Sequence, residues 1–125
     1  MAAASQHTMI LIEPDDAVRT ALLTLLAGRG WDVVGRADAS ELDAMISDSR
    51  CDAIISESAL PDRSAADVLE AAKRSGVPVI FTGHEQAVQR AVDLVRMGAL
   101  DFLEKPFPQA RLIALLDALS PRQRK

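Results

Sequence analysis

The sequence contains few of the residues that build disulfides, metal centres or membrane spans. A single cysteine, Cys51, excludes an internal disulfide and a zinc site made of several cysteines. No apolar run approaches the roughly 20 residues of a membrane-spanning helix. The start, MAAASQHT, lacks the basic region and apolar stretch of a signal peptide. No glycine-rich loop follows the first apolar run, which disfavours a nucleotide binder or a small nucleotide-dependent enzyme. We therefore expect a cytoplasmic protein without a membrane segment.

Positive charge is also scarce. The 125 residues include 14 Lys and Arg against 18 Asp and Glu, a net charge of -4, so no global basic field favours nucleic acid. The basic cluster Arg122, Arg124 and Lys125 is typical of a solvated end. The chain is 49% hydrophobic, and domains of this size bury about two thirds of their unfolded surface. We expect one domain over residues 8–119, with a disordered tail at 1–7 and a second tail at 120–125.

Short apolar runs alternate with longer amphipathic segments along the chain. The short runs predict strands at 9–13, 31–36, 52–57, 77–82 and 99–104. The amphipathic segments predict helices at 15–30, 40–49, 64–75, 85–97 and 108–119. Asp15 and Ser64 suit helix N-termini, where they accept from free backbone N–H groups, and Ser40 with Asp43 forms an approximate capping box. Strict alternation favours a parallel sheet with helices on both faces.

Polar residues stand at the ends of the predicted strands. Four of these ends read Glu13-Pro14, Glu57-Ser58, Thr82-Gly83 and Glu104-Lys105. The working site of an open parallel α/β sheet lies beyond the carboxyl ends of its strands, so we expect these side chains to converge. Taken singly, each has an ordinary explanation, such as solvation for a glutamate or strand propensity for a threonine. Their coincidence favours a site.

Four segments of the sequence resemble a known family. The segments ILIEPDDAVR, DAIISESALPD, VIFTGH and ALDFLEKPF are similar to the receiver domain of two-component response regulators, in the branch that includes nitrogen-fixation and nitrogen-regulation regulators. The resemblance covers about residues 8–119. It implies a flavodoxin-like, three-layer α/β fold, with a five-stranded parallel sheet in strand order 2-1-3-4-5 and five flanking helices.

The resemblance also implies a phosphoryl-transfer site. In the family, a histidine kinase transfers a phosphoryl group to an aspartate, an acidic pair holds Mg²⁺, a Thr or Ser and a Lys engage the phosphoryl group, and an aromatic residue turns inward as a switch. Glu57 takes the phosphoacceptor position here, with Pro61 four residues later. The other matched positions are Lys105 for the lysine, Thr82 and Phe102 for the switch, and Glu13 with Pro14 for the acidic pair.

Two departures from the family pattern weaken this chemistry. Glu57 replaces aspartate, and the extra methylene moves the carboxylate by more than about 1 Å, which can cost roughly 100-fold in rate. Pro14 supplies no side-chain oxygen where Mg²⁺ needs a carboxylate. The magnesium site at Glu13, Pro14 and Glu57 is therefore degenerate, and we expect no cofactor, or weak Mg²⁺ binding at most.

The longer Glu57 side chain places a negative charge where a phosphoryl group would lie. We expect Lys105 to pair with that charge and Thr82 to donate a hydrogen bond to it, a partial imitation of the modified state. The run 77–82 is one residue short against the family spacing. It therefore either takes Pro78 into the strand or shortens the strand's start, and Thr82 is expected to be aimed imperfectly.

The last helix and its neighbours indicate a contact surface. The segment 108–119 carries more large aliphatic residues than a single core-facing stripe needs, and a helix that covers a large core is an equal alternative. In the family, dimerisation and effector contacts use the face formed by segments corresponding to 85–97, 99–104 and 108–119. The candidate interface residues are Arg90, Arg96, Asp101, Arg111 and Leu115.

The sequence thus predicts a degenerate receiver domain of a bacterial two-component or phosphorelay system, not an enzyme, that acts by protein–protein interaction without ordinary aspartyl phosphorylation. The expected partners are a histidine kinase, phosphotransfer protein or effector, and a second copy of the chain; nucleic acid and membrane are not expected partners. One alternative is a working phosphoacceptor that uses Glu57 or a metal arrangement with Asp15, which shares the acidic pocket with Glu13. Another is the regulatory fragment of a DNA-binding transcription factor.

Overall fold

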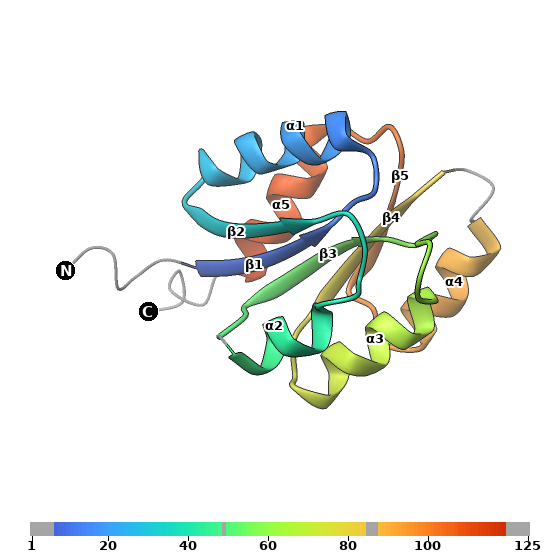
Figure 1. The fold of residues 1–125 in the computed structure, drawn as a ribbon. Coiled ribbons are helices and arrows are strands. Elements are labelled where there is room, and N and C mark those ends of the chain that lie inside the picture. The colour runs from blue at the N-terminus through green and yellow to red at the C-terminus, as the bar shows by residue number, and fades with distance from the viewer. Residues whose placement is uncertain (1–6, 49, 85–87, 120–125) are drawn as a thin grey trace.

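Strands and helices alternate along the chain in the computed structural model, which describes residues 7–48, 50–84 and 88–119 (Figure 1). The strands are β1 (His7–Ile12), β2 (Trp31–Arg36), β3 (Ala53–Glu57), β4 (Val79–Gly83) and β5 (Asp101–Glu104). The helices are α1 (Asp16–Ala27), α2 (Leu42–Asp48), α3 (Ala65–Arg74), α4 (Val88–Arg96) and α5 (Gln109–Leu119). In these described ranges the strands form one parallel sheet in the order β2-β1-β3-β4-β5, so the predicted flavodoxin-like fold is confirmed.

Two of the predicted helix caps are confirmed. The Asp15 carboxylate accepts from the Val18 N–H at 3.1 Å, and the Ser64 hydroxyl accepts from the Asp67 N–H at 3.0 Å. Each bond satisfies one of the backbone donors that a helix leaves free at its start. Gly76, with φ of 70°, follows the end of α3 in a conformation that favours glycine.

The predicted cap at Ser40 is wrong. Helix α2 begins at Leu42, and the Ser40 N–H and O–H groups donate to the Asp38 carboxylate at 3.0 and 2.8 Å. These two bonds lower the pKa of Asp38. The Ser40 hydroxyl therefore donates to Asp38 and does not cap α2, and the segment before α2 is a turn.

Several boundaries differ from the sequence expectation. Strand β1 begins at His7, a residue predicted to lie in the tail. The His7 ring centroid lies 5.0 Å from the Trp31 ring centroid. Strand β4 begins at Val79, directly after Pro78. The Pro78 carbonyl accepts from the Ile54 N–H of β3 at 3.0 Å, so proline contributes an acceptor at the strand's start, where its missing N–H is not needed. The predicted tails at 1–6 and 120–125, and the predicted helix start at 85–87, lie outside the described residues.

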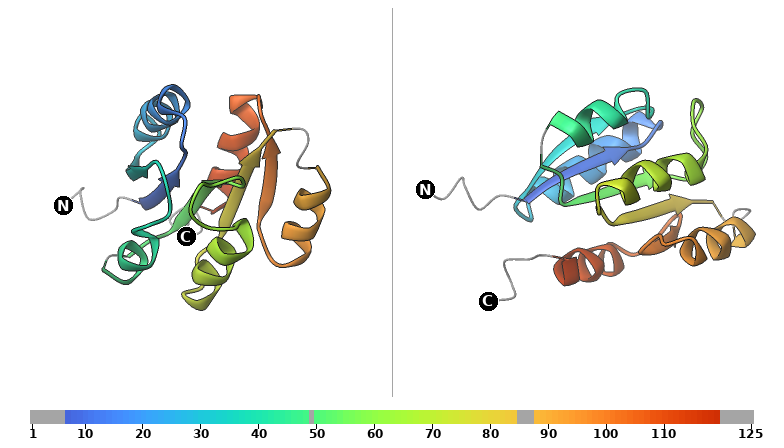
Figure 2. Two further views of the ribbon diagram at one scale, coloured as in Figure 1. Left: turned by 45° about the vertical axis from the view of Figure 1, so that its right-hand side comes forward. Right: turned by 90° about the horizontal axis from the view of Figure 1, so that it is seen from below.

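Helices cover both faces of the sheet, α1 and α5 on one side and α2, α3 and α4 on the other (Figures 1 and 2). Alternate residues of each strand supply the two apolar layers. Ile10, Ile54 and Phe81 face the layer that contains Leu69 and Leu94. The opposite layer contains Leu11, Ile55, Ile80, Leu26 and Leu112. No helix within the described ranges is long and apolar enough to cross a membrane.

Candidate functional site

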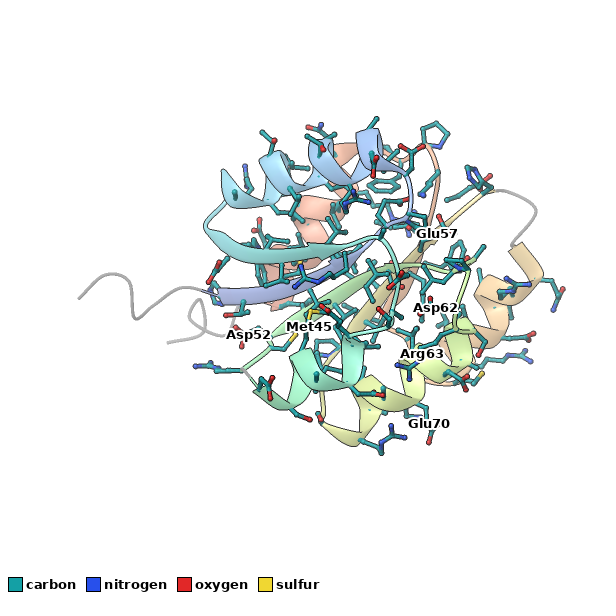
Figure 3. All side chains as sticks on the ribbon, viewed as in Figure 1. Met45, Asp52, Glu57, Asp62, Arg63 and Glu70 are labelled. Carbon is teal, nitrogen blue, oxygen red and sulfur yellow. The ribbon has the colours of Figure 1, made fainter. Side chains whose placement is uncertain are left out.

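Three ionisable side chains meet at the carboxyl edge of the sheet, each just at or beyond a strand end. Backbone bonds continue the ladder there: the Glu13 N–H donates to the Arg36 carbonyl at 2.9 Å, and the Lys105 N–H donates to the Gly83 carbonyl at 2.6 Å. Glu57 is the last residue of β3 and pairs in register with Thr82. Figure 3 shows Glu57 at the end of the sheet opposite the two chain termini. The predicted convergence of strand ends is therefore present.

The Lys105 ammonium lies between two buried carboxylates. Its Nζ is 2.5 Å from Glu57 Oε1 and 2.6 Å from Glu13 Oε1. The side chains of Lys105, Glu13 and Glu57 are 13%, 3% and 6% exposed. One cation thus joins the ends of β1, β3 and β5. The predicted ion pair of Lys105 with Glu57 is present, and Lys105 also pairs with Glu13, which was not predicted.

The remaining carboxylate oxygens are also engaged. Glu57 Oε2 accepts from the Ala59 N–H at 3.0 Å and from the Ser58 hydroxyl at 3.4 Å. Glu13 Oε2 accepts from the Asp15 N–H at 3.0 Å. Among the described residues, every fully buried side-chain nitrogen or oxygen has a hydrogen-bond partner. Both carboxylates are therefore held from two sides, by Lys105 and by the backbone.

The ion pairs shift the lysine's acid–base equilibrium. Partial burial acts to lower the pKa of Lys105, but the hydrogen bonds and charges of Glu13 and Glu57 outweigh it and raise the pKa above its usual value. Lys105 is therefore a cation throughout the neutral range. A hydrogen bond in which both partners carry charge is stronger than a neutral one, so this contact is a main electrostatic feature of the pocket.

The residues of this pocket do not fit the magnesium ion of the family. Mg²⁺ needs near-octahedral oxygen ligands. Pro14 offers no side-chain oxygen, and the Oε1 atoms of both glutamates already contact Lys105. Asp15 lines the cleft, yet its carboxylate caps α1. Within the described part of the chain, no group of three or more His, Cys, Asp or Glu side chains is arranged to hold a metal ion.

The hydroxyl that donates to Glu57 belongs to Ser58, although Thr82 is its neighbour in the register of β3 and β4. Thr82 is 1% exposed, and no hydrogen bond between described residues joins its hydroxyl to Glu57. The prediction that Thr82 donates a hydrogen bond to Glu57 is therefore wrong, because Glu57 Oε2 turns toward the loop that follows β3. Ser58 could have been identified from the sequence, since it directly follows the strand-end carboxylate.

The Phe102 ring packs over the end of β4. A Cβ atom added at Gly83 would lie 2.7 Å from Phe102 Cζ and 2.7 Å from Ser58 Oγ, so only glycine fits under these two side chains. Phe102 is half-buried and packs against the core layer on the α3 and α4 side. The aromatic ring therefore lies against β4, next to the hydroxyl that contacts Glu57.

A cleft of about 290 Å³ opens above the ion pairs. Its walls include Pro14, Asp15, Val18 and His84, and its floor includes Glu57 and Lys105. Arg19 holds the backbone beside the cleft, since its Nη1 donates to the Glu13 carbonyl at 2.7 Å. This contact of Arg19 was not predicted from the sequence, in which its position one turn into α1 was the available signal.

The predicted interface residues do not all lie on one surface. Asp101 and Arg111 form an ion pair of 3.3 Å between β5 and α5, and Arg96 is exposed near the end of α4. Arg90 instead lines a separate cleft between α3 and α4. Leu115 is half-buried against the core layer under α1 and α5. Arg90 and Leu115 are therefore poor members of the predicted interface.

The exposed apolar surface lies on α4 and the segment after it. Among the described residues, the exposed large hydrophobic side chains are Val92 (44%), Val95 (44%), Met97 (42%) and Leu100 (42%). In α5, Leu112 and Leu116 are buried, and Leu115 and Leu119 pack against the same core layer. Helix α5 therefore mainly covers the core, and α4 with the segment after it carries the exposed apolar surface.

A parallel sheet in this strand order, with a carboxylate, a hydroxyl and a lysine at its carboxyl edge, defines a receiver-type α/β domain. A family model described as the response regulator receiver domain matches residues 9–117, so the chain belongs to the receiver-domain family of two-component response regulators. Members of this family are signalling domains.

Individual relatives agree with this assignment. The transcriptional regulatory protein FixJ of Azorhizobium caulinodans is 36% identical over 113 residues, which cover 86% of this chain and 52% of FixJ. The DNA-binding transcriptional regulator NtrC of Rhizobium meliloti is 30% identical over 111 residues, which cover 87% of this chain and 23% of NtrC. The chain is thus homologous to FixJ- and NtrC-type regulators and spans about half of FixJ and less of NtrC.

A solved structure shows the same fold. The crystal structure of a response regulator receiver domain protein from Clostridium thermocellum superposes with a TM-score of 0.85, at 20% identity, and covers 94% of this chain and 97% of that chain. At this identity the likeness concerns the fold alone.

Proposed function

We propose that this receiver domain works in the cytoplasm as a protein-interaction module, not as an enzyme, and that ordinary aspartyl phosphorylation does not control it. The observation that carries the proposal is the state of the Glu57 carboxylate. It is buried, Lys105 holds one of its oxygens, and Ala59 and Ser58 hold the other. An oxygen engaged in this way is a poor nucleophile toward phosphorus, which needs an in-line approach.

The same contacts support a fixed signalling state. Glu57 carries a permanent negative charge paired with Lys105, and the Phe102 ring lies against Gly83 beside Ser58. A phosphoryl group would carry more charge and more acceptor oxygens, so the imitation is partial. In this proposal, Phe102 is held inward by packing, and Thr82 does not act as the movable switch.

The proposal is tested by incubating the chain with acetyl phosphate, or with beryllofluoride, in the presence of Mg²⁺. Intact mass and the chemical shifts around Glu57 and Thr82 report modification. We expect no added phosphoryl mass and no change in these shifts. A stable adduct on Glu57 would contradict the proposal and favour the working phosphoacceptor.

A restoration experiment tests the assignment of the two altered positions. The double variant Glu57→Asp with Pro14→Asp shortens the acceptor and supplies the missing carboxylate, so it should gain magnesium-dependent modification. The matched controls are the two single variants, which each lack one requirement and should gain little. If the folded double variant remains unmodified, the matched positions are not those of the family site.

The partner surface that we propose combines α4 and β5 with the start of α5. Val92, Val95 and Leu100 provide exposed apolar area, and the Asp101–Arg111 pair and Arg96 provide charge beside it. Such a surface suits a second copy of the chain, or a kinase, phosphotransfer protein or effector. Sedimentation over a range of concentrations would detect the self-association.

A second candidate function is regulation of a DNA-binding output domain. It is favoured by the relatives, which are transcriptional regulators of which this chain covers only a part. The chain carries a net charge of -4, so DNA contact would belong to the output domain. The mass of the protein isolated from its native cells, compared with that of the 125-residue chain, tests this candidate.

A further inference from the structure

We propose that Lys105 is the resident cation of this site and takes the place of a divalent metal ion, so that the chain itself supplies the positive charge. This inference rests on the proposed function, because it explains how the pocket stays in one state without an external ligand. The family's magnesium ion does not fit the residues that are present, and that disagreement is the starting point.

The geometry of the carboxylates supports this role. Glu13 and Glu57 each carry one methylene more than aspartate, and both reach a single point, the Lys105 Nζ, with contacts of 2.6 and 2.5 Å. An ammonium group has three donors, and two of them are used here. A divalent cation at these oxygens would compete with Lys105 for them and would lie beside its positive charge, which repels it.

The backbone fixes the two carboxylates independently of the lysine. The Asp15 N–H holds Glu13 Oε2, and the Ala59 N–H holds Glu57 Oε2. If the ammonium were removed, both Oε1 atoms would still point toward the same space beneath an open cleft. Two uncompensated buried carboxylates favour a cation between them, and water from the cleft can complete the ligands of a divalent ion held by two carboxylates. The wild-type chain should therefore ignore divalent cations, whereas a chain without the Lys105 charge should bind them.

Thermal unfolding of the full chain, with and without MgCl₂ or MnCl₂, tests the inference. For Lys105→Met we expect the cations, at about 10 mM, to raise the melting temperature by at least about 3 °C over an NaCl control of equal ionic strength. For the wild type we expect no such rise. Lys73→Met is the matched control, because Lys73 Nζ donates to the Met97 carbonyl, away from the pocket. It should behave as the wild type.

Two outcomes would overturn the inference: a wild-type chain stabilised by the cations as strongly as Lys105→Met, or a folded Lys105→Met chain that gains nothing. Should Lys105→Met fail to fold, Lys105→Gln serves instead, and Mn²⁺ titration of the wild type followed by nuclear magnetic resonance still decides. Paramagnetic broadening centred on Glu13 and Glu57 in the wild type would contradict the role of Lys105.

These outcomes are separate from a failure of the proposed function. An adduct on Glu57 in the wild type would contradict the interaction-module proposal, and it is read by mass. Failure of the Lys105 variants to bind cations would leave that proposal intact and would remove only the lysine's role as a metal substitute.

Discussion

The pocket at the carboxyl edge of the sheet and the outer surface of α4 differ in how their side chains are satisfied. In the pocket, Glu13, Glu57 and Lys105 are nearly buried, and each makes short contacts with the others or with backbone N–H groups. On α4, Val92 and Val95 are each 44% exposed. The charged groups of the pocket already have partners, whereas the α4 surface still has apolar area to bury. The contrast supports the proposal that this receiver domain works through contacts and not through phosphoryl transfer.

The two regions also differ in what a mutation should cost. Removing one partner of a buried ion pair leaves an uncompensated charge in a poorly solvated place. Changing an exposed valine alters little in the folded monomer, because water already contacts it. Stability measurements and association measurements should therefore separate the pocket from the α4 surface.

The largest expected effect is that of Lys105→Met. It strands the Glu13 and Glu57 carboxylates, and we expect the free energy of unfolding to fall by roughly 3 kcal/mol in a urea titration. Lys73→Met is the control for loss of an exposed lysine. Combining Lys105→Met with Glu13→Gln and Glu57→Gln should recover much of the loss, because no charge is then stranded. A loss no larger than that of the control would break the contrast between the two regions.

The pH dependence of that loss sharpens the same point. The pKa of Lys105 is raised in the folded state, so its stabilising effect is fully present below the unfolded pKa, about 10.4, and is lost as pH rises through the folded pKa. The stability gap between the wild type and Lys105→Met should therefore narrow as pH rises through the folded pKa of Lys105. A gap that stays the same in strong alkali, with both chains folded, would show that Lys105 is not the cation of the pocket.

Gly83→Ala should have the next largest effect. The added Cβ would lie 2.7 Å from both the Phe102 ring and the Ser58 hydroxyl, so one of them must move. Overpacking of this kind costs about 2 kcal/mol. Gly28→Ala is the control, since its new Cβ would make ordinary contacts of 3.4 Å or more at a helical φ of -66°. Ring resonances of Phe102 should shift in Gly83→Ala and not in Gly28→Ala.

Ser58→Ala and Thr82→Val compare two hydroxyls of the pocket, and a smaller effect is expected. Ser58 donates to Glu57, so its loss should lower the free energy of unfolding by about 1 kcal/mol and shift the Glu57 carboxylate carbon resonance. Thr82→Val keeps the shape of the side chain and should leave that resonance in place. The reverse pattern would return Thr82 to the role that the family resemblance implies.

The smallest effect on stability should come from the α4 surface. The double variant Val92→Lys with Val95→Lys should change the free energy of unfolding by less than about 0.5 kcal/mol. It should nevertheless reduce self-association in sedimentation experiments, because it places charge in the proposed contact area. Thr20→Lys with Thr24→Lys, at two exposed positions on α1 outside that area, would control for added charge. Self-association that is unchanged in the double variant would move the contact surface elsewhere.

Much of the fold followed from local patterns. The alternation of short apolar runs with amphipathic segments located every strand and helix of the described chain, and Asp15 and Ser64 were correctly placed as caps. Ser40 failed as a cap because Asp38, two residues away, takes its hydroxyl as a donor. Competition between neighbouring polar side chains is decided by backbone angles that a capping pattern does not contain.

The residues of the candidate site were also accessible to sequence reasoning, because parallel strands bring their carboxyl ends together whatever the details of packing. What each side chain contacts there was not. Glu13 shares Lys105 with Glu57, Asp15 turns to its own helix, and Ser58 replaces Thr82 as the hydroxyl donor. These choices depend on the distances and orientations of groups brought together from separate strands.

The surface was the least predictable part of the molecule. The leucines of α5 are more numerous than one core-facing stripe needs, but they pack into the core layer under α1 and α5. The exposed apolar residues lie on α4 and the segment after it. Amino-acid order alone is enough for the strand order and the position of the pocket. Only the packed structure decides which carboxylates Lys105 neutralises and which helix keeps apolar area free, since both depend on distances between elements far apart in the chain.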